Sequence, residues 1–179
     1  MTTYLIIDAE TTSLEPSENG RVTCISTYNK DNGETKSFID LDESKILRDF
    51  WDYVKSLKTP TLVTFNGSYF DIPYVVHRSI VRNEKVFSYK LIDLRLIANS
   101  FFTSYDKKAK GSLAYWAAVL GIEQKTPPGA EMINLFMEKK LDEIKCHCQE
   151  DVLITNALFD RLKEVGLIYE GIENARRKY

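Results

Sequence analysis

The sequence has few of the features that mark secreted or membrane proteins. Three cysteines in 179 residues are too few for a disulfide framework and suit a reducing compartment. The longest apolar stretch, residues 114–122, is far shorter than the roughly 20 residues that a membrane span needs. The first residues lack the basic start and apolar core of a signal peptide. These absences predict an intracellular, cytoplasmic protein with no membrane partner.

An excess of basic charge is also missing. The chain has 24 Lys and Arg against 26 Asp and Glu, a net charge of −2, and its pI is about 5.8. Domains that bind nucleic acid over a broadly basic surface usually have a pI above about 9, so the composition argues against such a surface but does not exclude a locally basic groove. No repeat, low-complexity block or Pro/Gly/Ser-rich linker divides the sequence. We therefore expect residues 1–179 to form a single domain.

The order of the expected secondary-structure elements indicates an α/β fold. Apolar runs bounded by turn residues predict strands at 4–9, 21–29, 36–40, 61–65 and 90–93. Apolar residues at three- and four-residue steps predict helices at 44–58, 72–82, 113–120, 129–139 and 141–165. Asp31-Asn32-Gly33 is a hairpin signal, and Ser44 and Ser112 are the expected N-caps of two helices. This order predicts a mixed sheet with helices packed on it.

Two acidic residues stand at the end of the first expected strand. Residues two apart point to the same face of a strand, so the carboxylates of Asp8 and Glu10 should converge at the carboxyl edge of the sheet, where α/β folds bind ligands. A surface or turn-forming role is the alternative for this pair. Asp71 follows a turn segment and precedes a helix with Pro73 in its first turn, so its alternative role is an N-cap.

Asp151 lies on the apolar stripe of the last expected helix. The other members of this stripe follow one another at three- and four-residue steps: Ile144, His147, Ile154, Leu158 and Leu162. An ionised carboxylate on a buried stripe is costly unless it is paired or bound to a metal. His147 lies one turn earlier on the same face, so a structural His–Asp pair is the alternative to a metal site.

The triplet Cys146-His147-Cys148 has the side chains of a zinc site but not its spacing. Successive helix positions diverge by about 100°, so the three side chains cannot readily converge on one ion. A structural zinc site also needs four ligands, often in spaced pairs. We therefore expect no zinc site and interpret the cysteines as core or inert residues.

Four carboxylates remain as candidate ligands: Asp8, Glu10, Asp71 and Asp151. Hard oxygen ligands suit Mg²⁺ or Mn²⁺. Two such ions roughly 4 Å apart form a clamp for phosphodiester cleavage, in which one ion activates the attacking water and the other stabilises the leaving oxygen.

Three segments, in order, resemble the motifs of the DEDD-type 3′–5′ exonucleases, which have a ribonuclease H-like fold. They are residues 4–12, the Asn-x-x-x-Phe-Asp pattern at 66–71, and residues 147–151. The subgroup with Tyr in the third motif, which includes family B polymerase proofreading domains, is the most similar. Here His147 stands in the tyrosine position with the same three-residue gap before Asp151, whereas the histidine subgroup normally has four residues.

The resemblance implies a mixed five-stranded sheet flanked by helices, and roles for individual residues. Asp8, Glu10, Asp71 and Asp151 would hold two Mg²⁺ or Mn²⁺ ions, and His147 would orient or deprotonate the attacking water. Five further residues correspond to the substrate-binding region: Thr11, Thr12, Leu14, Asn66 and Phe70. For Asn66 and Phe70, packing roles are the alternative. Asp93 matches no ligand position and is interpreted as a helix cap.

The implied activity is hydrolysis at the 3′ end of single-stranded DNA or RNA, with release of nucleoside 5′-monophosphates. A polymerase or repair protein is an expected kind of partner. Residues 78–110 contain eight basic and three acidic residues with interleaved aromatics, which suits contact with a single strand but also suits a solvated charge run. The alternatives are a catalytically weak nucleic-acid-binding module and an endonuclease. DNA or RNA preference and oligomeric state stay open.

Overall fold

The computed structural model describes residues 3–17, 19–100, 111–126 and 132–168. Five strands form one sheet in the order β3-β2-β1-β4-β5. The strands are β1 (Tyr4–Thr11), β2 (Val22–Asn29), β3 (Thr35–Ile39), β4 (Thr61–Thr64) and β5 (Lys90–Asp93). The pairs β1–β2 and β2–β3 are antiparallel, whereas β1–β4 and β4–β5 are parallel. The expected α/β fold with a mixed five-stranded sheet is confirmed.

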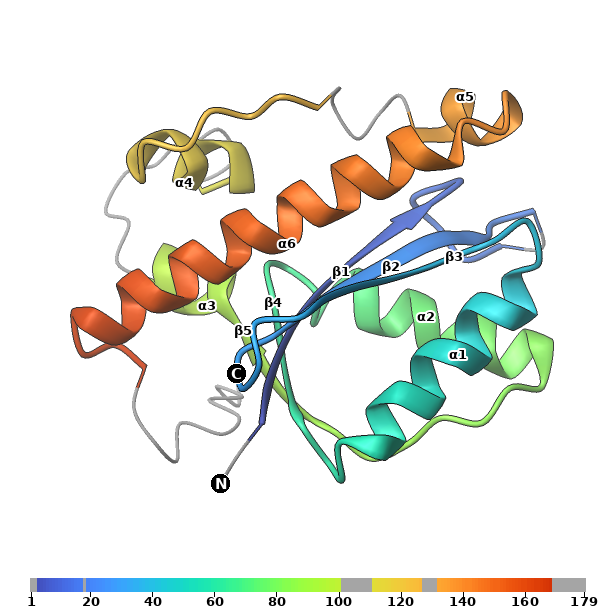
Figure 1. The fold of residues 1–179 in the computed structure, drawn as a ribbon, viewed down its shortest axis with the longest axis horizontal. Coiled ribbons are helices and arrows are strands. Elements are labelled where there is room, and N and C mark those ends of the chain that lie inside the picture. Colours follow the sequence, from blue (N-terminus) through green and yellow to red (C-terminus); the bar gives the residue numbers. More distant parts are fainter. Residues whose placement is uncertain (1–2, 18, 101–110, 127–131, 169–179) are drawn as a thin grey trace.

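Helices cover both faces of this sheet (Figure 1). On one face lie α1 (Glu43–Ser56) and α2 (Asp71–Arg82). On the other face, the long helix α6 (Leu141–Glu164) crosses β1 and β2 and also contacts α3 (Leu94–Asn99), α4 (Leu113–Val119) and α5 (Met132–Met137). Among the helices of the described residues, none combines the length and the apolar composition that a membrane crossing requires.

Alternate residues of β1 divide the core into two parts. Ile7 packs with residues of α1 and α2, whereas Ile6 packs with residues of α6 such as Leu158. Side chains two apart on a strand share a face, so Asp8 and Glu10 follow Ile6 on the α6 side. The apolar pattern of β1 thus places both acids beneath α6.

The helix limits agree closely with the sequence pattern, with differences at the ends. Ser112 caps α4 as expected, because its side chain accepts a hydrogen bond from the Tyr115 amide. The expected cap of α1 was wrong: Asp42 accepts the hydrogen bond from the amide of Ser44, which lies inside the helix. Both residue types cap helices well, so local sequence did not separate them. Residues 129–131, the expected start of α5, lie outside the described residues.

A buried ion pair joins α1, α2 and β2. The Glu43 carboxylate accepts hydrogen bonds from Arg78 Nε at 2.9 Å, Arg78 Nη2 at 2.8 Å and the Val22 amide at 2.8 Å. Arg82 Nε adds a contact to Glu43 at 2.6 Å. Both arginines belong to the basic segment 78–110, and Arg78 is only 1% exposed. Arg78 therefore holds the scaffold together instead of belonging to a free basic surface, whereas Arg82 stays exposed beside Glu43. Residues 101–110 of that segment lie outside the described residues.

Candidate active site

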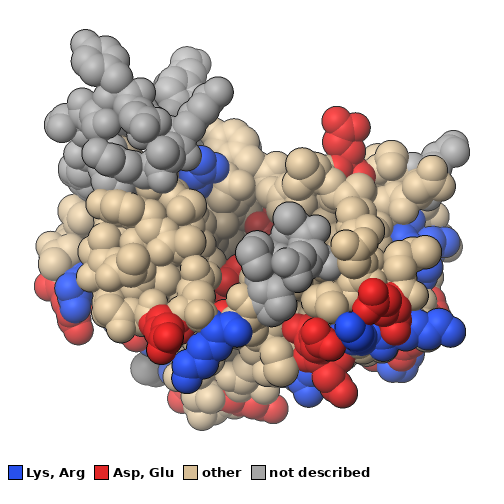
Figure 2. Space-filling model, turned by 90° about the horizontal axis from the view of Figure 1, so that it is seen from above, with Lys and Arg blue, Asp and Glu red and all other residues tan. Residues whose placement is uncertain are grey.

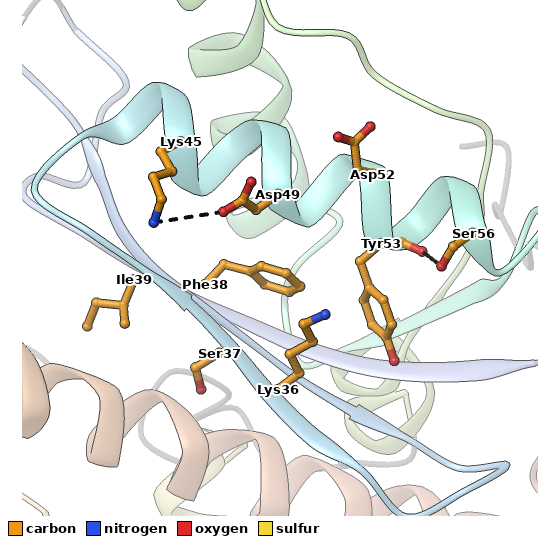
Figure 3. Close-up of a pocket in the computed structure, with 9 residues that line it drawn as sticks. All are labelled: Lys36, Ser37, Phe38, Ile39, Lys45, Asp49, Asp52, Tyr53 and Ser56. Carbon is orange, nitrogen blue, oxygen red and sulfur yellow. Dashed lines mark hydrogen bonds and ion pairs between the residues drawn. The ribbon is translucent and has the colours of Figure 1, made fainter.

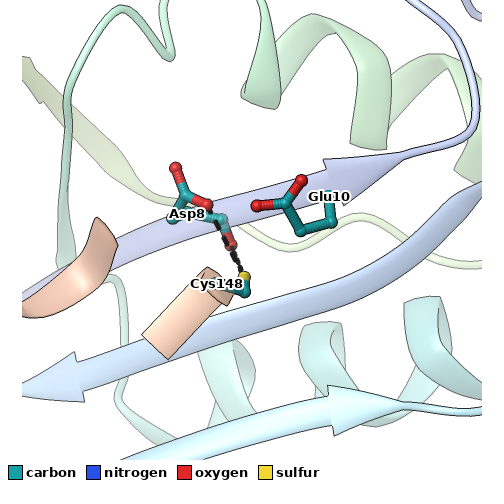
Figure 4. A group of neighbouring side chains, drawn as sticks. All are labelled: Asp8, Glu10 and Cys148. Carbon is teal, nitrogen blue, oxygen red and sulfur yellow. Dashed lines mark hydrogen bonds between the residues drawn. The ribbon is translucent and has the colours of Figure 1, made fainter. Parts of the chain in front are cut away.

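Asp8 and Glu10 lie under α6 near the carboxyl end of β1. In the register with β2, Asp8 is opposite Ser26 and Glu10 is opposite Cys24. The Sγ atom of Cys148, on α6, lies 3.6 Å from Asp8 Oδ2 and 3.4 Å from the Asp8 carbonyl oxygen (Figure 4). The pairing of β1 with β2 shifts register immediately after Glu10. The regular part of the strand therefore ends with these two acids.

The helix α6 contributes His147 and Asp151 to the same place. His147 Nε2 lies 3.5 Å from Glu10 Oε1 and 3.8 Å from Asp151 Oδ2. The rest of the expected stripe is buried: Ile144, Ile154, Leu158 and Leu162. The His147 side chain is 7% exposed and that of Asp151 is 20% exposed. The helical periodicity therefore places His147 and Asp151 on the face of α6 that lies over the acids of β1.

Asp71 enters from α2, on the opposite side of the sheet. Its Oδ1 accepts a hydrogen bond from the Ala9 amide at 3.1 Å, and the residue is buried. The alternative role of Asp71 as an N-cap is wrong, because Phe70 occupies the N-cap position and no side chain caps this helix end. The carboxylate is turned toward β1 instead, where its charge acts on Asp8. All four predicted acids thus meet around the end of β1.

Burial raises the pKa of all four carboxyl groups, and the charges of neighbouring acids add to the rise. Burial raises the pKa of Asp8 well above its usual range, and the charges of Asp71, Asp151 and Glu10 raise it further. Burial likewise raises the pKa of Glu10, as does the charge of Asp151. The pKa of Asp71 is raised to about 7, first by burial and then by the charges of Asp93 and Asp151, although the Ala9 amide opposes this rise. Burial also raises the pKa of Asp151, against the influence of His147. A positive charge bound among these acids would lower their pKa values.

The donor atoms fit one or more divalent cations. Ligand atoms of Asp8, Glu10 and Cys148 lie within 4.8 Å of one another, and so do those of Glu10, His147 and Asp151. The buried Oδ1 of Asp151 has no hydrogen-bond partner, which leaves a lone pair available to a cation. Figure 2 shows acidic atoms at the floor of a hollow on the face that carries α6. Carboxylate oxygens are the ligands that Mg²⁺ and Mn²⁺ prefer.

The predicted substrate-binding residues of the first motif surround the end of β1. Thr11 Oγ1 donates to the Ser13 carbonyl at 2.7 Å, and Thr12 Oγ1 accepts from the Arg21 amide at 3.0 Å. Both hydroxyls therefore shape the loop after β1. Leu14 differs, because it is 86% exposed.

The predicted residues of the second motif lie in the turn between β4 and α2. Phe70 is partly buried against the core, with its ring centroid 5.7 Å from that of Tyr74. Asn66 has a positive φ of 69°, and its Oδ1 accepts from Arg95 Nη1 at 2.6 Å. Phe70 therefore packs against the core, whereas the side chain of Asn66 is held by the guanidinium of Arg95 at the carboxyl edge of the sheet.

Asp93 does more than the cap role expected for it. It caps α3 through the Arg95 amide at 3.0 Å, as expected. Its carboxylate also accepts from the Asn66 amide at 2.9 Å, from the Ser68 amide at 3.0 Å and from Ser68 Oγ at 2.5 Å. These contacts fix the turn that leads to Asp71. Sequence reasoning missed this role because the contacts join residues 25 to 27 positions apart.

Cys148 also adjoins the acids, although the sequence indicated only a core or inert residue. The expected divergence of the triplet is confirmed, since Cys146 is exposed and Cys148 is buried. Cys148 lies four residues after Ile144 and four before Val152, both of which are buried. This spacing was the signal that could have placed its thiol on the face toward β1.

A surface groove lies away from these acids. It has a volume of about 480 Å³ and runs between β3 and α1 (Figure 3). Its lining includes Phe38, Tyr53 and an ion pair of Lys45 with Asp49, but none of the four acids. The groove is therefore not an extension of the acid cluster.

Comparison with known proteins identifies the family. The sequence profile of the RNase H superfamily matches residues 5–163, so the chain belongs to this superfamily. A similar solved structure is the family B DNA polymerase from the hyperthermophilic archaeon Pyrobaculum calidifontis, with a TM-score of 0.75 and 19% sequence identity. The match covers 91% of this chain and 25% of the polymerase chain, so the chain spans about a quarter of that protein. No curated protein matches the chain. Superfamily membership and the buried acids together support a nuclease-type function.

Proposed function

We propose that the protein is a metal-dependent 3′–5′ exonuclease acting on single-stranded DNA or RNA. It would hydrolyse the terminal phosphodiester bond and release nucleoside 5′-monophosphates. The observation that carries the proposal is the convergence of four acids from β1, α2 and α6, with His147 Nε2 3.5 Å from Glu10 Oε1. Membership of the RNase H superfamily and the fold shared with a family B DNA polymerase support the same activity.

The cations belong among the four acids. Asp8, Glu10, Asp71 and Asp151 would hold two Mg²⁺ or Mn²⁺ ions, since each offers carboxylate oxygens near the end of β1 and the buried Oδ1 of Asp151 has no hydrogen-bond partner. When bound, a pair of such ions lowers the pKa of water and stabilises the charge that develops on the phosphate and on the leaving oxygen. The positive charge of the bound ions would offset the mutual repulsion of the four ionised carboxylates.

His147 supplies the proton acceptor. In the reaction, the oxygen of a water molecule attacks the terminal phosphorus, and the bond from phosphorus to the 3′ oxygen of the preceding nucleotide breaks. His147 Nε2 accepts the proton that the water loses, and the leaving oxygen takes a proton from solvent. This nitrogen faces Glu10 and Asp151, so it adjoins the site at which water would attack.

The terminal nucleotide would lie over the end of β1. Leu14 offers an exposed apolar surface there for a base. Arg95, held by Asn66, offers a guanidinium at the same edge of the sheet for a phosphate or a ribose oxygen. Thr11 and Thr12 act by shaping the loop that carries Leu14.

The test uses linear single strands of DNA and of RNA with a label at the 5′ end. With Mn²⁺ or Mg²⁺, the protein should shorten the labelled strand stepwise from the 3′ end and release nucleoside 5′-monophosphates. Asp8→Asn should abolish the shortening, whereas Asp52→Asn, on the exposed side of α1, should not. The proposal is overturned by intact substrate with both metals, or by equal activity of the Asp8→Asn protein.

Two other functions give different outcomes in matched assays. An endonuclease would cleave a circular single strand, which has no 3′ end. A nucleic-acid-binding module without activity is favoured by the histidine in place of tyrosine, and it would bind single strands while showing no heat of Mn²⁺ binding in calorimetry.

A further inference from the structure

A hydroxyl group lies between His147 and a carboxylate outside the acid cluster. Thr126 Oγ1 is 2.8 Å from His147 Nδ1, the ring nitrogen that points away from the acids. The same hydroxyl donates a short hydrogen bond to Glu150 Oε2. Glu150 also accepts from the amide of Lys125 at 2.8 Å and from the amide of Thr126 at 3.1 Å. Glu150, Thr126 and His147 therefore form a continuous chain of hydrogen bonds.

The direction of this chain follows from the donors available. Each oxygen of the Glu150 carboxylate accepts a hydrogen bond from a backbone amide, Oε1 from Lys125 and Oε2 from Thr126, an arrangement that suits an ionised carboxylate. An ionised carboxylate only accepts, and a threonine hydroxyl has a single proton to donate. That proton is committed to Glu150. Thr126 Oγ1 must then accept a hydrogen bond from His147 Nδ1–H.

This direction determines the tautomer of the imidazole. A neutral imidazole carries one N–H, so a proton on Nδ1 leaves a lone pair on Nε2. Nε2 is the nitrogen that faces Glu10 Oε1 at 3.5 Å and Asp151 Oδ2 at 3.8 Å. The opposite tautomer would place two acceptors, Nδ1 and Oγ1, against each other at 2.8 Å.

We propose that Thr126 and Glu150 are positioning residues that keep a proton on Nδ1 of His147, so that the neutral imidazole presents the lone pair of Nε2 to the attacking water. This inference rests on the proposed function and deepens it. Neither residue belongs to the three motifs that the acids define, and Thr126 lies 21 positions before His147. Glu150 acts on His147 as the carboxylate does in a Ser-His-Asp triad, but through the hydroxyl of Thr126 instead of directly.

The tautomer can be read directly, independently of activity. The chain has two histidines, His77 and His147, so ¹⁵N NMR of the ring nitrogens of the full chain with Mg²⁺ yields two sets of signals, and His77→Gln assigns them. His147 should show the Nδ1–H pattern in the wild-type protein. Thr126→Val removes the hydroxyl at similar volume and should shift the ring toward the Nε2–H form that free imidazole side chains favour in water. Thr126→Ser should restore the wild-type pattern.

Turnover provides the second readout. Thr126→Val should lower kcat about tenfold or more while KM changes less than about twofold, because the effect acts on proton transfer and not on strand binding. Glu150→Gln should reproduce part of this loss, and Thr126→Ser should recover kcat. The matched control is Thr35→Val, at an exposed position on β3.

Failure of the positioning role and failure of the proposed nuclease function give different results. An Nε2–H pattern in the wild-type protein, or an unchanged pattern in Thr126→Val, overturns the positioning role whether or not the protein is active. Loss of kcat without a change of tautomer also overturns it, since the threonine would then act only on folding or packing. Absence of any nuclease activity overturns the proposed function, whereas the NMR measurement still tests the tautomer.

Discussion

Asp71→Asn should stabilise the metal-free protein at neutral and alkaline pH. Asp71 is 5% exposed, and the only hydrogen bond that its carboxylate accepts from another element among the described residues comes from the Ala9 amide. Asparagine keeps an oxygen that can accept this bond but carries no charge. The substitution therefore removes the cost of burying a charge, and with it the smaller repulsion by Asp93 and Asp151, while the hydrogen bond from the Ala9 amide can be kept.

The size and pH range of the effect follow from the pKa of Asp71. It is raised from 3.8 in the unfolded chain to about 7 in the folded one. A raised pKa in the folded state means that stability is highest at low pH and is lost as pH rises from about 4 through 7. At about 1.4 kcal/mol per pKa unit, the loss is at most about 4 kcal/mol. The variant lacks this group, so its advantage should be under about 1 kcal/mol at pH 4 and approach about 4 kcal/mol at pH 8.

Urea unfolding with a chelator at pH 4 and at pH 8 measures this difference. Asp52→Asn, on the exposed side of α1, is the control and should show no such pH dependence. With saturating Mn²⁺ at pH 8 the order should reverse, because the wild-type protein binds the cation more tightly and gains more stability from it. An advantage that does not grow with pH, or a less stable Asp71→Asn protein in chelator at pH 8, would refute the reasoning.

Two further substitutions test the scaffold around the site. Arg78→Met leaves the buried Glu43 carboxylate without its bidentate partner and should cost about 3–5 kcal/mol in the free energy of unfolding, whereas Lys45→Met, at an exposed ion pair, should cost far less. Similar losses for the two variants in urea titrations would contradict the importance of burial. Asp93→Ala removes the acceptor for the Asn66 turn and for the start of α3, and should cost about 2 kcal/mol or more. It should also lower kcat through misplacement of the following acid, and unchanged turnover would argue against that link.

The parts of the site that follow from local periodicity were predictable. The two-residue period of β1 places Asp8 and Glu10 on one face, and the helical period of α6 places His147 and Asp151 on one stripe. Both patterns depend only on neighbouring residues, so the sequence determines them. The expected and observed limits of β5 are also identical, at residues 90–93.

The parts that depend on distant contacts were not predictable. Asp71 looks like a helix cap in the sequence, and only its hydrogen bond to an amide 62 positions away shows its orientation. Arg78 looks like part of a solvated charge run until Glu43 is placed beside it. The link from Thr126 to His147 has no sequence pattern of its own, because it joins the segment after α4 to the first half of α6. In each case the partner is chosen by tertiary packing.

The central claim is that the acids around the end of β1 form a metal-dependent nuclease centre. The most direct test is the initial rate of shortening of a 5′-labelled single strand as a function of Mn²⁺ concentration, measured in parallel for the wild-type and Asp8→Asn proteins. We predict a rate that rises with Mn²⁺ to saturation for the wild-type protein, and no shortening above the chelator background for Asp8→Asn. A wild-type rate that is independent of Mn²⁺, or the same Mn²⁺ dependence in both proteins, would contradict the account.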